Sequence, residues 1–139
     1  MAEKALRWLL RAQAVLLLCA LPAAVMPTEW MDAAHRWLGM GPLPRAPLTE
    51  YLTRSVSMVY AAWGVQLALM AHDVRRYLPM VRLFGWMEVA GAAAFGVLDA
   101  LAGLPLAWTL GEAGMLLALG GSVVILVRGV EARYNEEPG

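Results

Sequence analysis

The sequence predicts an all-α membrane protein, a bundle of four transmembrane helices with a short amphipathic helix in the outer loop between helices one and two. Hydrophobic residues make up 60% of the 139 residues, whereas they make up less than half of a typical soluble domain. They gather in four stretches of about twenty residues, the length of a helix that crosses roughly 30 Å of hydrocarbon. Because these stretches are rich in Ala and Leu and do not alternate, strands are not expected. We expect a single membrane domain over residues 1–139.

Charge and cysteine content exclude several classes of function. Eleven basic residues balance eleven acidic ones, so no nucleic-acid partner is expected. The only cysteine, Cys19, cannot form an internal disulfide or a paired redox motif. No phosphate-binding loop, serine triad or metal-ligand cluster stands out. We therefore expect no catalytic residues, no metal site and no cofactor.

The first apolar stretch, about 5–26, has two interpretations. Lys4, Arg7 and Arg11 precede an apolar core, as they do in a cleaved signal peptide. A lipid-modified Cys19 is a further alternative, but Leu18 stands where such a site takes a small residue. We favour an uncleaved transmembrane helix.

The outer segment, 28–50, has two halves. Its first half is expected to form a helix with Thr28 as N-cap and Gly39 as the C-terminal stop. Such a helix lies in the headgroup layer or packs as a lid over the bundle, and the two arrangements are compatible. The second half, GPLPRAPL, contains three prolines and is expected to be irregular. The apolar face of the helix contains Trp30, Ala34, Trp37 and Leu38.

The other three helices are expected at about 51–71, 80–101 and 106–127. The turn AGLP between the last two is short enough to make them antiparallel neighbours. Each helix has a face of small and polar residues, which favours close packing inside a bundle. On the three helices in order, these are Arg54, Ser57, Ala61, Gly64, Ala68 and His72; Gly85, Glu88, Ala92, Gly96 and Asp99; and Gly111, Gly114, Ala118 and Gly121.

The positive-inside rule predicts the orientation. With both termini in the cytoplasm, eight basic residues lie inside and three lie outside, which is the bias expected of a multi-pass protein of the bacterial cytoplasmic (inner) membrane. The inside residues are Lys4, Arg7, Arg11, Arg75, Arg76, Arg82, Arg128 and Arg133; the outside residues are Arg36, Arg45 and Arg54.

Intramembrane acids supply the candidate ligand or proton site. In the outer half, Arg54 is the only base, and Asp99 and Glu112 compete for it. One arginine cannot neutralise two carboxylates in a medium of low dielectric, so one acid is left to bind a proton or a cation. The alternative is an ion pair that only fixes helix register. Glu88 lies near the bilayer centre, with Arg11, Gln13 and Gln66 at similar depth as candidate partners.

The segments EYLTRSVSMVYAAWG, DVRRYLPMVRLFGW and LPLAWTLGE together resemble a family of small bacterial four-helix integral membrane proteins with no established activity. More loosely, the hairpin architecture is similar to the DoxX-like group. The resemblance extends over about residues 27–128 and implies a four-helix bundle with recurrent use of Arg54, Tyr77, Trp108 and Glu112. It implies no catalytic assignment.

Three functions are consistent with the sequence. The first is a non-enzymatic accessory or structural membrane module, which we favour at this point. The second is a binder or carrier of a small amphipathic ligand or of a proton, through Arg54, Asp99 and Glu112. The third is a redox subunit that binds quinone or haem. The expected partners are the lipid bilayer and, through the small-residue faces, a second copy of the chain or another membrane protein.

Overall fold

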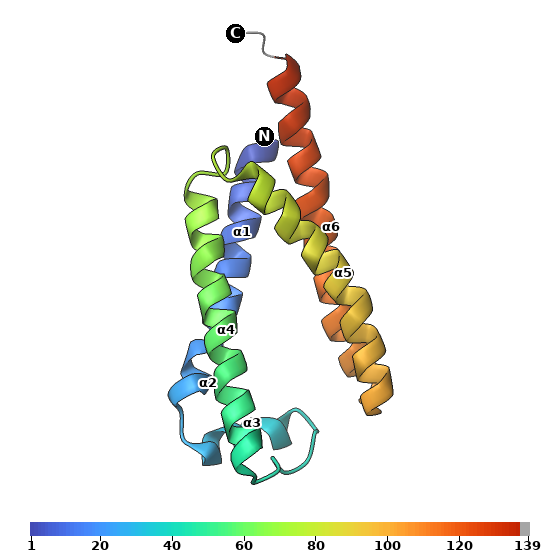
Figure 1. Ribbon diagram of the computed structural model, residues 1–139. Coiled ribbons are helices and arrows are strands. Elements are labelled where there is room, and N and C mark those ends of the chain that lie inside the picture. The colour runs from blue at the N-terminus through green and yellow to red at the C-terminus, as the bar shows by residue number, and fades with distance from the viewer. Residues whose placement is uncertain (137–139) are drawn as a thin grey trace. The chain divides into compact units, whose positions relative to one another are not determined.

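The computed structural model describes residues 1–136, with side chains as far as Tyr134, and within them the chain is helical without any strand. The prediction of an all-α protein is therefore confirmed for this part of the chain (Figure 1). The helices are α1 (Ala2–Leu18), α2 (Leu21–Val25), α3 (Thr28–Trp37), α4 (Pro47–His72), α5 (Leu78–Ala102) and α6 (Leu106–Glu136).

The first apolar stretch forms two helices, because it breaks between Leu18 and Leu21. Pro22 has no backbone N–H and cannot continue the helical hydrogen bonds of α1. The amide of Cys19 still donates to Val15 at 3.0 Å, but that of Ala20 donates to Leu17 at 3.1 Å, in a tighter turn. The proline thus ends α1 and is accommodated in the first turn of α2.

Two further helices differ from their predicted bounds. Helix α4 begins at Pro47 instead of about residue 51, because proline fits the first turn, where its missing N–H has no helical partner. Helix α6 extends to Glu136 instead of about residue 127. Its added turns contain no proline and carry polar residues such as Arg128 and Glu131, so they continue the helix beyond its apolar part.

Helix α3 confirms the predicted amphipathic helix but not its N-cap. Its N-cap is Pro27, and no side chain caps it. The hydroxyl of Thr28 instead donates to Glu50 at 3.2 Å, so it joins α3 to the start of α4. The predicted stop is confirmed, because Gly39 follows the helix with a φ of 78°, a conformation that glycine adopts without strain.

Three segments are long and apolar enough to cross a membrane: Ala2–Val25, Leu78–Ala102 and Leu106–Tyr134. The first contains both α1 and α2. Helix α4 is 26 residues long but carries Arg54, Gln66 and several hydroxyl groups, and it is not among the three. The prediction that it also spans the membrane stays a prediction.

The chain divides into two compact units, and α1 and α4 each contribute to both. The first unit contains Met1–Leu10 and the chain from Met70 onward, and the second contains Arg11–Leu69.

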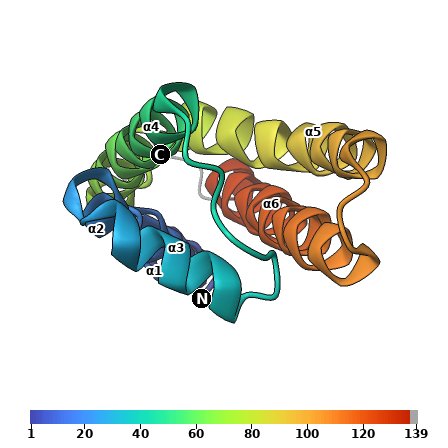
Figure 2. The same ribbon diagram turned by 90° about the horizontal axis from the view of Figure 1, so that it is seen from below.

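In the first unit, α5 and α6 form an antiparallel hairpin, seen side by side in Figures 1 and 2. Gly85 of α5 lies against Val123, where an added Cβ would be 2.8 Å from that side chain. At Gly120 of α6 an added Cβ would be 2.7 Å from both the Glu88 Cβ and the Gly85 carbonyl oxygen. The close approach predicted for small residues is thus found at Gly85, and it also occurs at Gly120, which is not among the predicted residues.

The face of small residues predicted for α6 is not the face that packs on α5. A Cβ added at Gly111, Gly114 or Gly121 would meet nothing within 4 Å. The packed face instead contains Ala113, Gly120 and Val123, and Val123 is fully buried. A stripe of glycines marks one face of a helix but does not fix which neighbouring helix that face contacts. In α6 the β-branched side chains of another face fill the interface with α5.

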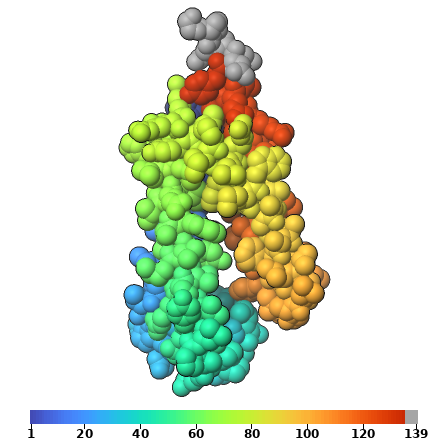
Figure 3. Space-filling view, in the orientation of Figure 1, coloured from blue at the N-terminus to red at the C-terminus, as the bar shows by residue number. Residues whose placement is uncertain are grey.

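The core of the first unit gathers at one end, where the start of α1, the turn after α4, the start of α5 and the second half of α6 meet. Its fully buried side chains include Leu6, Leu10, Val74, Val81 and Val127. The outward surface of α5 is apolar and exposed, with Leu83, Met87 and Leu98 each more than half accessible. Figure 3 shows this helix as a yellow to orange surface. An exposed apolar helix surface of this kind suits lipid.

In the second unit, the end of α1 packs against α4. A Cβ added at Gly64 would be 2.9 Å from the Leu18 side chain and 3.0 Å from the Ala14 carbonyl. Ser57 and Ala61 are buried on the same face of α4, as predicted, whereas Ala68 and His72 of the predicted face are exposed.

Candidate functional site

Asp99 is a buried acid near the end of α5. Only 6% of its surface is exposed, and its Oδ2 atom accepts no hydrogen bond from the residues that the structure describes. Buried polar atoms nearly always have a partner, because loss of hydration without one costs free energy. A proton or a cationic group bound to this oxygen would supply the partner that it lacks.

The backbone around Asp99 explains its position. Gly103 ends α5 with a φ of 69°, and the Leu104 amide donates back to the Asp99 carbonyl at 3.0 Å. This glycine-terminated turn leads directly into α6. A Cβ added at Gly96 would lie 3.7 Å from the Cβ of Ala113 on α6. In an antiparallel pair with that register, Asp99 is level with the first turns of α6.

Glu112 lies in those turns, on the face of α6 next to the one that packs on α5. Its Oε2 atom accepts a hydrogen bond of 3.0 Å from the indole of Trp108, one turn earlier. The two side chains help to line a shallow, mainly apolar pocket of about 390 Å³, together with Ala107, Gly111 and Met115. An acid on an apolar wall, with an aromatic ring beside it, suits an amphipathic ligand that carries a positive charge.

Arg54 makes a different contact from the one predicted for it as a counter-charge. Its Nη1 atom donates to the Ala24 carbonyl at 2.9 Å, and so it joins α4 to the last turn of α2 within the second unit. This carbonyl lies at the end of a five-residue helix, where main-chain acceptors lack helical partners. Because Asp99 and Glu112 belong to the first unit, a cluster of all three residues stays a prediction.

Glu88, the fourth candidate, is half-buried in the middle of α5. Its Cβ atom lies where Gly120 of α6 allows the helices to approach closely. Its proposed partners Arg11 and Gln13 lie in the second unit, and Gln66 is exposed there. The position of Glu88 against the α6 backbone indicates a packing role for the stem of its side chain.

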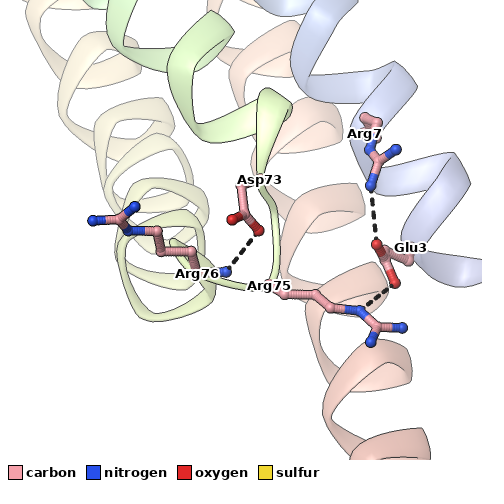
Figure 4. Close-up of polar contacts among 5 residues, drawn as sticks. All are labelled: Glu3, Arg7, Asp73, Arg75 and Arg76. Atoms are coloured by element: carbon pink, nitrogen blue, oxygen red, sulfur yellow. Dashed lines mark hydrogen bonds and ion pairs between the residues drawn. The ribbon is translucent and has the colours of Figure 1, made fainter.

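A second polar cluster, not predicted from the sequence, lies at the opposite end of the first unit. Glu3 accepts hydrogen bonds from Arg7 and Arg75, both at 3.0 Å, and so joins the first turns of α1 to the turn after α4 (Figure 4). In the same turn, Asp73 accepts the Arg76 amide at 3.1 Å. The four-residue spacing of Glu3 and Arg7 is a signal for a helical ion pair, but the contact with Arg75 is visible only in the fold.

Among the described residues, no group of three or more His, Cys, Asp or Glu side chains is placed to hold a metal ion. His35 instead interacts through Nδ1 with the Gly41 carbonyl at 2.9 Å, in the connector after α3. Cys19 is exposed.

Comparison with protein families, with characterised proteins and with solved structures finds no match for this chain.

Proposed function

We propose that this protein is a non-catalytic, multi-pass membrane protein that binds a proton or a small amphipathic cation at Asp99 and Glu112. The observation that carries the proposal is the buried Asp99 carboxylate, whose Oδ2 atom has no hydrogen-bond donor among the described residues. An unpaired charge inside a membrane costs at least about 2.5 kcal/mol. A bound proton or cation removes most of this cost.

The pocket beside Glu112 supports an amphipathic ligand over a simple ion. Its wall is mainly apolar, and Trp108 orients the carboxylate through its indole N–H. An alkyl chain would lie against Met115 and Ala107, and a cationic head would face Glu112. The proposal includes α4 as a fourth membrane helix and places both termini in the cytoplasm, so that Asp99 and Glu112 lie in the outer half of the membrane.

Carbodiimide labelling tests this function. Protein in bilayer nanodiscs is treated at neutral pH with dicyclohexylcarbodiimide, which enters apolar surroundings and reacts with carboxyl groups that hold a proton. Peptide mass spectrometry should find the adduct at Asp99 or Glu112 and not at Asp73, an exposed acid in the turn after α4. Dodecyltrimethylammonium, used as an amphipathic cation, should slow the labelling several-fold.

Two variants make the assignment specific. Asp99→Asn and Glu112→Gln keep the size of each side chain and should each remove only their own adduct. A water-soluble carbodiimide with an added amine should still label Asp73, which shows that this control acid is reactive. If the hydrophobic reagent labels neither Asp99 nor Glu112, the acids are sealed, and the protein is better described as an accessory or structural membrane module.

A further inference from the structure

A basic pocket of about 290 Å³ lies in the first unit, between the start of α1, the turn after α4 and the last turns of α6. Its wall includes four basic side chains, one acid and one aromatic ring: Lys4, Arg7, Arg75, Arg133, Glu3 and Tyr134. The site proposed above, at Asp99 and Glu112, uses none of these residues.

The positive charge of this pocket exceeds what its own acid neutralises. Glu3 is shared between Arg7 and Arg75, each at 3.0 Å. The side chains of Lys4 and Arg133 make no ion pair or hydrogen bond with the residues that the structure describes. The nearby acid Glu131 is engaged with Arg82 at 3.2 Å. Among the residues that the structure describes, four basic side chains therefore surround one carboxylate, and this excess of positive charge attracts an anion.

In the described part of the chain, the guanidinium group of Arg7 has a donor without a hydrogen-bond acceptor. Its Nη2 atom binds Glu3, but its Nε–H is buried and has no acceptor among the described residues. The guanidinium group presents its donors in a planar fork that matches two oxygens of a phosphate or carboxylate. The Arg7 guanidinium thus has more donors than Glu3 uses, which makes it a suitable donor to an anion.

The surroundings of the pocket favour a phosphate group held at a membrane surface. The pocket lies where apolar helices end, and Arg75 stacks over the Tyr134 ring at 5.1 Å from its centroid. Beside it on α1, the Trp8 side chain is 68% exposed, as in residues that anchor helices among headgroups. Basic pockets between membrane helices at the cytoplasmic side suit anionic headgroups.

We propose that this pocket binds the phosphate group of an anionic phospholipid, with Arg7, Arg75, Lys4 and Arg133 as its donors. The same chemistry would recognise free phosphate, and the experiment below separates the two sources.

The test measures lipid retention by native mass spectrometry. The full-length protein is incorporated into nanodiscs of phosphatidylcholine with phosphatidylglycerol and released into mild detergent. The wild-type protein should retain phosphatidylglycerol in preference to phosphatidylcholine. Arg7→Gln should reduce the retained phosphatidylglycerol several-fold. Equal retention of both lipids by the wild-type protein would overturn the proposal.

Arg36→Gln is the matched control. Arg36 also forms a 3.0 Å ion pair with an acid four residues earlier in a helix, Asp32, but it lies in α3, away from this pocket. The control should retain as much phosphatidylglycerol as the wild type. A loss equal to that in Arg7→Gln would mean that total charge, and not the pocket, determines retention.

Glu3→Gln separates binding from structure. It breaks the contacts with both Arg7 and Arg75 but makes the pocket more positive, so retention should be kept or increased. A decrease would mean that Arg7→Gln acts by loosening the helices, which would overturn the proposal. In a parallel arm with inorganic phosphate and no lipid, a phosphate adduct as abundant as the phosphatidylglycerol adduct would overturn the lipid as the source.

Discussion

At the scale of single residues, the interface of α5 and α6 distinguishes two adjacent glycines. Gly120 lies against the backbone of Gly85 and Val89 on α5, whereas Gly121 has open space where a Cβ would be. One residue along a helix turns the side chain by about 100°, so the sequence GG alone does not indicate which of the two packs.

Gly120→Ala is therefore expected to destabilise the hairpin. Its Cβ would be 2.7 Å from a backbone carbonyl oxygen and 2.9 Å from a backbone nitrogen, and backbone atoms yield less easily than side chains. Overpacking of this kind costs about 1–3 kcal/mol. Thermal unfolding in detergent should show a lower midpoint.

Gly121→Ala is the control for this prediction. It should leave the midpoint unchanged or raise it slightly, because alanine favours helix more than glycine does. Equal midpoints for the two variants would show that the helices do not approach each other at Gly120.

At the scale of elements, α3 is joined to its connector by the carboxylate of Asp32. The Leu43 amide donates to Oδ1 at 2.7 Å, and Arg36 donates to Oδ2 at 3.0 Å. The Leu43 hydrogen bond, followed by that of Arg36, lowers the pKa of Asp32 below its usual value of 3.8. Asp32 thus closes a short loop from α3 to Leu43. Trp30 and Trp37 of α3 are 67% and 85% accessible, which suits side chains in the headgroup layer.

This lowered pKa predicts that the loop opens in acid. A depressed pKa means that the carboxylate form stabilises the loop above pH 3.8, and that this stabilisation is lost as pH falls through the lower folded value. The protection of the Leu43 amide against hydrogen exchange, corrected for the intrinsic rate, should fall below about pH 4.

Asp32→Asn tests whether the charge is responsible. Asparagine keeps an acceptor oxygen for Leu43 but has no carboxylate to titrate, so its Leu43 protection should be weaker and should not change with pH in this range. A wild-type protection factor that stays constant between about pH 6 and pH 3 would contradict the prediction.

At the scale of the whole molecule, the number of membrane crossings depends on α4. Three segments are apolar and long enough to span, and with α4 as a fourth the two ends of the chain return to one side. That topology would place eight of the eleven basic residues inside and three outside, which is the bias that the positive-inside rule expects.

The crossing by α4 is tested with two cysteines in a Cys19→Ala background. Arg45→Cys lies in the connector before α4 and Arg76→Cys in the turn after it, and both original side chains are exposed. An impermeant maleimide should label the first on intact cells and the second only after the membrane is opened. Labelling of both on the same side would show that α4 does not span. Each variant removes one arginine, so the two variants have the same net charge.

The sequence alone predicted a helical chain with four apolar stretches, some of which contain acids, and three segments of the structure are long and apolar enough to cross a membrane. It also indicated the stop at Gly39 and the small-residue face of α5 at Gly85 and Ala92. These are properties of composition and spacing along the chain, which do not depend on what each helix meets.

The three-dimensional structure shows which groups meet. It showed that Pro22 divides the first stretch, that Arg54 binds the Ala24 carbonyl, that Gly120 and not Gly121 packs, and that Glu3 joins Arg7 to Arg75. The reason is that pairing depends on the rotation and register of two helices together. A shift of one residue moves a side chain about a quarter of the way around its helix, and hydropathy along one segment carries no information about that shift.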